Sequence, residues 1–78
     1  MLFKPKSQLV FISLRELPRK ENKGTFWVVA LADTNTYENI EFFPKNPQDF
    51  SNFEQGELID VMLDFSGRYC SLVLADGN

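Results

Sequence analysis

The chain has 78 residues, with one cysteine, no histidine and a net charge of −3. This length leaves room for one hydrophobic core, so we expect a single domain over residues 1–78. The lone cysteine excludes an intrachain disulfide, and the absence of histidine argues against a structural metal site. No apolar run approaches the roughly 20 residues of a membrane helix, the N-terminus lacks the apolar core of a signal peptide, and a single thiol fits a reducing compartment. We therefore expect a cytoplasmic protein with no membrane partner.

Five segments have the alternation or enrichment of apolar residues that is typical of β-strands. They are residues 8–15, 25–31, 36–43, 57–65 and 68–75. Residues 16–24 are predicted to form a loop, because Pro18 stops strand pairing and Gly24 closes the segment. Residues 33–36 predict a tight turn that joins the second and third strands into a hairpin. Gly67 supplies the positive φ needed between the last two strands.

A short helical turn is predicted over residues 49–54, after two prolines end the hairpin. Phe50 and Phe53 lie three residues apart, so they project to the same side and are expected to plug one end of the core. This order of elements matches the oligonucleotide/oligosaccharide-binding (OB) fold, whereas an SH3-like barrel usually places its helical turn before the last strand. We predict an all-β protein: a small five-stranded OB-like barrel with one short helical turn between strands 3 and 4.

The first strand carries apolar residues on both faces. We assign Val10, Ile12 and Leu14 to the core because this set is uniformly aliphatic, which turns Leu9 and Phe11 outward. Other apolar residues fall on outward faces of the fourth and fifth strands, more than a monomer of this size is expected to expose. A symmetric homodimer explains them most simply. The predicted dimer interface consists of Leu9, Phe11, Leu58, Met62 and Val73.

In length, strand order and loop placement, the chain resembles the very small single-stranded-DNA-binding, helix-destabilising proteins of phages and plasmids. Those proteins are minimal five-stranded barrels that work as homodimers and coat single strands cooperatively. The resemblance covers most of the chain, but it rests on architecture rather than on a diagnostic motif, so it transfers no residue role. It implies a homodimer that functions in phage or plasmid replication and binds single-stranded DNA or RNA, with no small-molecule cofactor.

Binding to single strands requires cations near the phosphates and exposed aromatic faces for the bases. Residues 1–24 carry six basic and two acidic residues, whereas residues 25–78 carry two basic and nine acidic residues. This split predicts a basic surface feature on an acidic body. The predicted nucleic-acid-binding residues combine the basic loop with aromatics on outward faces: Arg15, Arg19, Lys20, Lys23, Trp27, Tyr37, Phe43, Arg68 and Tyr69.

Two other functions remain open at this point. The outward apolar residues and the acidic body also suit a small adaptor or inhibitor that docks on another protein. Catalysis is the weakest alternative, because the chain has no histidine for acid–base chemistry near neutral pH, no phosphate-binding loop motif and no nucleophile elbow. We therefore expect a binding protein rather than an enzyme.

Overall fold

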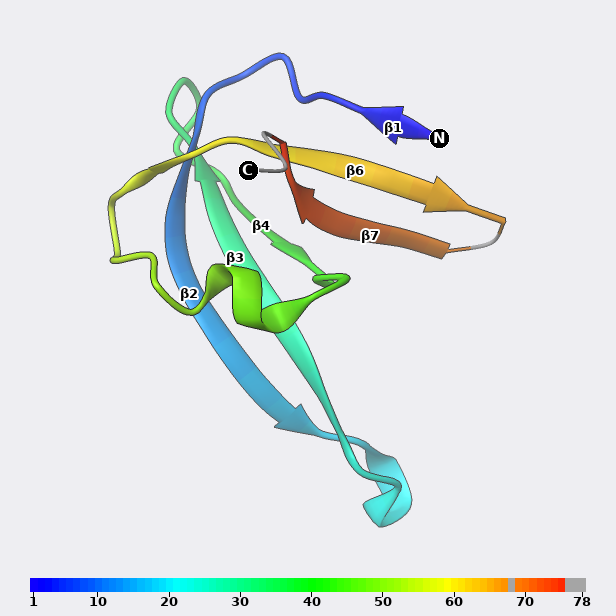
Figure 1. Ribbon diagram of the computed structural model, residues 1–78. Coiled ribbons are helices and arrows are strands. Elements are labelled where there is room, and N and C mark those ends of the chain that lie inside the picture. Colours follow the sequence, from blue (N-terminus) through cyan, green and yellow to red (C-terminus); the bar gives the residue numbers. More distant parts are fainter. Residues whose placement is uncertain (68, 76–78) are drawn as a thin grey trace.

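The computed structural model describes residues 1–67 and 69–75, without the side chains of Asn22 and Tyr69 (Figure 1). The described residues form seven strands and two short 3₁₀ turns (η). They are β1 (Leu2–Phe3), β2 (Leu9–Pro18), η1 (Lys20–Asn22), β3 (Thr25–Asp33), β4 (Asn39–Phe42), η2 (Pro47–Phe50), β5 (Leu58–Ile59), β6 (Val61–Ser66) and β7 (Tyr69–Leu74). Within the described residues no helix is long and apolar enough to span a bilayer.

The strands form two antiparallel sheets, in the orders β4-β3-β2-β5 and β1-β6-β7. The chain passes from the first sheet to the second at Asp60, between β5 and β6. At the opposite edge of the first sheet, Pro44, which follows β4, forms a single parallel bridge with Leu72 of β7. The predicted β class is confirmed, but the structure is not a closed barrel. β4 is only four residues long, and the chain just after it makes this single bridge with β7 instead of a ladder of paired residues.

A β-bulge in β2 determines which of its residues enter the core. The register of β2 against β3 shifts between Phe11 and Ser13. A bulge adds one residue to one strand, so the side chains beyond it change face. Leu9 and Phe11 are therefore each only 5% exposed and lie in the core, and Leu14 packs against the same core from beyond the bulge. The prediction that Leu9 and Phe11 face outward is wrong.

The helical turn closes one end of this core. Pro47 occupies the first turn of η2, where its fixed φ favours the helical conformation, and Ser51 Oγ donates a hydrogen bond to the Gln48 carbonyl at 2.8 Å. Phe50 is 1% exposed, and its ring centroid lies 6.5 Å from that of Phe53, which packs on the same core. The predicted helical turn is present but spans Pro47–Phe50 rather than residues 49–54; Phe50 is buried as predicted, and Phe53 is half-buried against the same core.

The β3–β4 turn forms at the predicted residues. Asp33 Oδ1 accepts hydrogen bonds from the backbone N–H groups of Asn35 at 2.7 Å and Thr36 at 3.4 Å. These bonds hold the pKa of Asp33 below its usual value, the Asn35 bond most strongly. Tyr37 follows with a φ of 62°, so β4 begins only at Asn39. Ile40 of β4 is 40% exposed, whereas Phe42 packs against the core.

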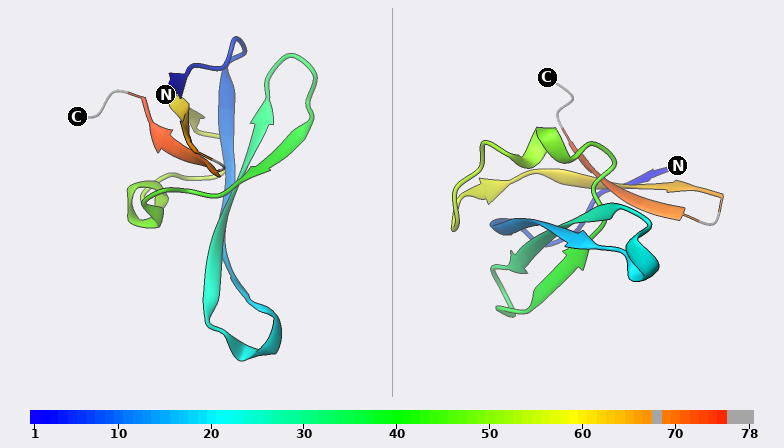
Figure 2. Two further views of the ribbon diagram at one scale, coloured as in Figure 1. Left: turned by 90° about the vertical axis from the view of Figure 1, so that its right-hand side faces the viewer. Right: turned by 90° about the horizontal axis from the view of Figure 1, so that it is seen from below.

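β2 and β3 continue beyond both sheets as a two-stranded ribbon (Figures 1 and 2). We call residues 15–28 the arm, because β4 pairs only with the part of β3 from Val29 to Ala32. The predicted loop over residues 16–24 is too long: Glu16 to Pro18 are strand and pair with Trp27 to Thr25. Proline is tolerated there because β2 is an edge strand in the arm, where only β3 pairs with it. The arm contributes to an elongated molecule with a longest dimension of 38 Å.

Candidate nucleic-acid interface

The basic residues of the arm gather at its tip, which turns through η1. The backbone N–H of Arg19 donates to the Gly24 carbonyl at 2.9 Å and closes the hairpin. Arg19, Lys20 and Lys23 are all exposed around this turn. The arm therefore carries the predicted basic cluster away from the acidic body, at the end of a hydrogen-bonded ribbon (Figure 2, left).

One face of the arm, here called the outer face, carries a row of one cation and two aromatic rings. The guanidinium carbon of Arg19 lies 5.5 Å from the centroid of the Phe26 ring. The Phe26 centroid lies 5.9 Å from that of Phe43, with a tilt of 56° between the rings. Phe43 is 60% exposed. We call Arg19, Phe26 and Phe43 the aromatic row.

The sequence prediction included Arg19 and Phe43 but missed Phe26, because its neighbour Trp27 was predicted to face outward and adjacent strand residues face opposite sides. Phe26 is half-buried beneath Arg19 and Phe43. The signal that could have found it is the hairpin itself. Once Arg19 and Gly24 close the turn, Pro18 and Thr25 pair and Phe26 follows directly, within reach of the Arg19 side chain.

Two of the predicted cations are paired with acids in this structure. Arg15 forms an ion pair with Glu41 on β4, and Lys23 Nζ lies 3.6 Å from a carboxylate oxygen of Glu21. Both pairs are exposed, and such pairs contribute at most about 1 kcal/mol to stability, so a phosphate can compete for the cation. Arg19 and Lys20 have no acidic partner among the described residues.

Several predicted residues do not join this row. Tyr37 is 85% exposed, but it follows the β3–β4 turn, at the opposite end of the sheet from the arm tip (Figures 1 and 2). Arg68 lies outside the described residues, and so does the side chain of Tyr69. The structure therefore brings together the arm residues of the prediction and leaves Tyr37 apart.

Trp27 lies on the other face of the arm, here called the inner face. It was predicted to face outward, but it shares its face with the core residue Val29, and it is half-buried. With Leu14 it forms one wall of a cleft of about 450 Å³. The other residues that line this cleft are Asn46, Pro47, Gln48 and Ser51.

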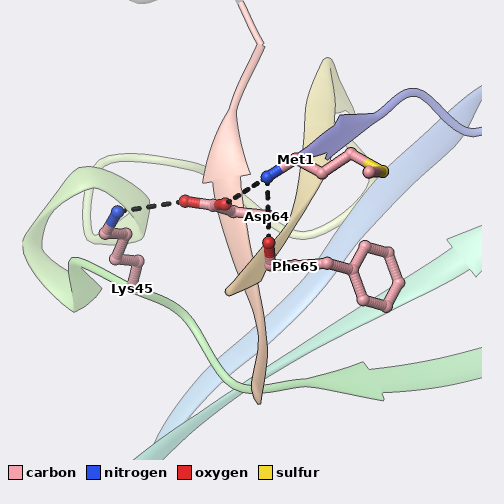
Figure 3. Close-up of polar contacts among 4 residues, drawn as sticks. All are labelled: Met1, Lys45, Asp64 and Phe65. Atoms are coloured by element: carbon pink, nitrogen blue, oxygen red, sulfur yellow. Dashed lines mark hydrogen bonds and ion pairs between the residues drawn. The ribbon is translucent and has the colours of Figure 1, made fainter. Parts of the chain in front are cut away.

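A polar cluster connects the two sheets near the start of the chain (Figure 3). Lys45 Nζ donates a hydrogen bond to Asp64 Oδ2 at 3.0 Å, and the Met1 amino group lies 3.7 Å from Asp64 Oδ1. The same amino group donates to the Phe65 carbonyl at 2.9 Å. The hydrogen bond from Lys45 is the main reason that the pKa of Asp64 lies below its usual value. Lys45 is therefore engaged in joining the sheets.

The residues predicted to form the dimer interface differ in burial. Leu9 and Phe11 are buried within the chain's own core, and Leu58 is 54% exposed. Met62 and Val73 face each other across β6 and β7 and are half-buried. A different apolar surface lies along β1 and the end of β6. We call this surface the edge patch; its exposed residues are Met1, Phe3 and Phe65.

Within residues 1–67 and 69–75, no three Asp, Glu, Cys or His side chains gather where they could hold one metal ion. Comparison of the chain with protein-family models, with curated proteins and with solved structures finds no match. The function must therefore be argued from the geometry of the arm, the cleft and the edge patch.

Proposed function

We propose that this protein binds single-stranded nucleic acid, primarily DNA. Binding uses the outer face of the arm and is largely independent of sequence. The observation that carries this proposal is the aromatic row: the Arg19 guanidinium packs over the Phe26 ring of the arm, and Phe26 in turn contacts the exposed ring of Phe43. Bases stack on aromatic rings with about 1–3 kcal/mol each, and Arg adds cation–π and phosphate contacts.

The net charge of −3 is compatible with this function because the charges are segregated. Arg19 and Lys20 lie at the tip of the arm, which carries four basic and two acidic residues, whereas the other nine acidic residues of the sequence lie outside the arm. Charges in physiological salt are screened over a Debye length of about 8 Å. The longest dimension of the molecule is 38 Å, so the acids of the body are largely screened from a phosphate at the arm tip.

We further propose that the fold is an OB-type barrel that is only partly open, as this fold allows. The pairing order supports it: β4, β3, β2 and β5 are neighbours, β5 leads into β6, and β6 pairs with β7. The parallel bridge between Pro44 and Leu72 then returns to the end of β4. In this interpretation β5 and β6 count as one strand, and the two-residue β1 is an addition at the edge.

We also propose that the protein forms a homodimer in which the edge patches of the two copies are in contact. β1 is the outermost strand of its sheet, and Phe3 and Phe65 pack edge to face with centroids 5.1 Å apart. Together with Met1 and Leu63 they line an apolar hollow of about 530 Å³. A small domain gains stability when a second copy covers such a surface. Sedimentation at tens of micromolar tests it: wild type is expected as a dimer and Phe65→Ser as a monomer.

The edge patch also favours the second candidate function, a module that docks on another protein. Retention on single-stranded-DNA cellulose, with and without nuclease treatment, separates the two. A nucleic-acid-binding protein is retained in the absence of any partner and is released by the nuclease. A docking module passes through, and its binding to a partner depends on Phe3 and Phe65 rather than on the aromatic row.

The direct test uses fluorescence anisotropy of a labelled oligo-dT and of a labelled duplex. We expect tighter binding to the single strand. The logarithm of the affinity should fall with the logarithm of the salt concentration, with a slope near −0.7 for each phosphate neutralised. No binding of the single strand at micromolar protein and about 50 mM salt would overturn the proposed function.

A further inference from the structure

The cleft beside Trp27 has one flat, largely apolar wall and one polar wall. Trp27 of β3 and Leu14 of β2 form the first wall, and four residues around η2 form the second: Asn46, Pro47, Gln48 and Ser51. None of the lining residues carries a charge. A phosphate or another ion therefore finds no counter-charge there, and an alkyl chain would leave the polar wall without partners. The chemistry fits a flat, neutral ligand that has hydrogen-bonding groups on its edge.

The polar wall is held in place while its amides remain available. The backbone N–H of Asp49 donates to the Asn46 carbonyl at 3.1 Å, and Ser51 donates to the Gln48 carbonyl through both its N–H and its hydroxyl. In the described part of the chain, the side-chain amides of Asn46 and Gln48 make no hydrogen bond. Each offers one donor group and one acceptor to a ligand.

The cleft is connected to the aromatic row by a short, fixed segment. Phe43 belongs to the row on the outer face, and Asn46, three residues later, lines the cleft on the inner face. Between them the chain is anchored to β7, because Leu72 N donates to the Phe43 carbonyl at 2.8 Å and Lys45 N donates to the Leu72 carbonyl at 3.0 Å. The row and the cleft therefore lie on opposite faces of β3, with two residues of the chain between Phe43 and Asn46.

We propose that this cleft binds one unstacked nucleobase of the bound strand, which stacks on Trp27 and is read at its edge by Asn46 and Gln48. This inference rests on the proposed function and adds to it a single position with base preference. The preferred base is adenine, because an Asn or Gln amide forms two hydrogen bonds with adenine, through N6 and N7. The other nucleotides of the strand contact the row and are not discriminated.

Trp27 is the only tryptophan of the chain, so its fluorescence reports on this cleft alone. The experiment titrates the full-length protein with oligo-dA and with oligo-dT, following both Trp27 emission and the anisotropy of labelled strands. We expect oligo-dA to quench Trp27 at saturation and to bind more tightly than oligo-dT. The double variant Asn46→Ala/Gln48→Ala should lose about tenfold in affinity for oligo-dA and remain within about twofold for oligo-dT.

The matched control is Asn52→Ala/Gln55→Ala, which removes the same two residue types from exposed positions that do not line the cleft. This variant should bind both strands like wild type. If the strands bind but Trp27 emission does not change, or if Asn46→Ala/Gln48→Ala weakens both strands equally, the cleft proposal fails and single-strand binding stands. If wild type binds neither strand, the proposed function fails, and the cleft proposal fails with it.

Discussion

Phe26 and Trp27 are adjacent in β3, yet they face opposite sides of the arm. Phe26 contacts Arg19 and Phe43 on the outer face, and Trp27 lines the cleft on the inner face with Asn46 and Gln48. This arrangement follows from the alternation of side chains along a strand. A ribbon that extends beyond its sheet exposes aromatic side chains on both faces, and each face has different neighbours. In the proposed complex, Phe26 belongs to the aromatic row, and Trp27 stacks on the one base that Asn46 and Gln48 read.

The aromatic row predicts that Phe26→Ala weakens single-strand binding about tenfold, because stacking on one aromatic ring is worth about 1–3 kcal/mol. Fluorescence anisotropy with oligo-dT measures the loss, and circular dichroism checks that the variant is folded. Tyr37→Ala is the control, since it removes a more exposed aromatic residue at the opposite end of the sheet. Its affinity should stay within about twofold of wild type. Equal losses in both variants would place the binding surface beyond the arm.

The Arg15–Glu41 ion pair predicts a variant that binds more tightly than wild type. Glu41→Gln removes an acid beside the row and leaves Arg15 free for a phosphate. The affinity for oligo-dT at low salt should rise, and the salt slope should become steeper by about 0.7. Stability should change by less than about 1 kcal/mol, because the pair is exposed. Glu38→Gln, which removes a charge near the β3–β4 turn, should leave the slope unchanged. A fall in affinity for Glu41→Gln would contradict this role of the pair.

The strands and turns were largely predictable from the sequence, because they depend on local chemistry. The turn at Asp33 follows from a side chain that accepts hydrogen bonds from the backbone two and three residues ahead. The presence of a helical turn follows from the spacing of Phe50 and Phe53, but its start at Pro47, two residues before the predicted residue 49, follows from the preference of proline for the first turn. In each case the residues that determine the conformation are near neighbours in the chain.

The faces of the strands and the residues of the cleft were not predictable, because they depend on distant pairing. The bulge after Phe11 has no glycine to mark it, and the alternation in the sequence continues through Ile12 without a break. Asn46 and Gln48 resemble ordinary loop residues until the fold places them opposite Trp27. The arm was missed because Pro18 suggested the end of pairing, although proline is tolerated on an edge strand such as this part of β2.

The contact between Lys45 and Asp64 predicts a stability difference that depends on pH. The pKa of Asp64 in the folded protein is below 3.8, its value without these partners, mainly because Lys45 donates a hydrogen bond to it. A lowered pKa stabilises the fold above the unfolded-state value, and this contribution disappears as the pH falls through the folded-state value. Asp64→Asn should therefore lower the Tm at neutral pH, and the difference from wild type should shrink below about pH 3.8. Asp60→Asn, which changes a neighbouring exposed carboxylate, is the control and should not show this pattern.

The β-bulge predicts which residues of β2 matter most for stability. Phe11 lies in the core and stacks on Phe53 with centroids 5.9 Å apart, whereas Ile12 is only half-buried at the bulge. Phe11→Ala should cost about 3–5 kcal/mol of unfolding free energy in urea titrations, because it leaves a cavity that the core cannot fill. Ile12→Ala should cost less than half as much, and Val10→Ala, half-buried on the opposite face, serves as a second comparison. A larger loss for Ile12→Ala than for Phe11→Ala would mean that β2 keeps a regular register and that Ile12 enters the core instead.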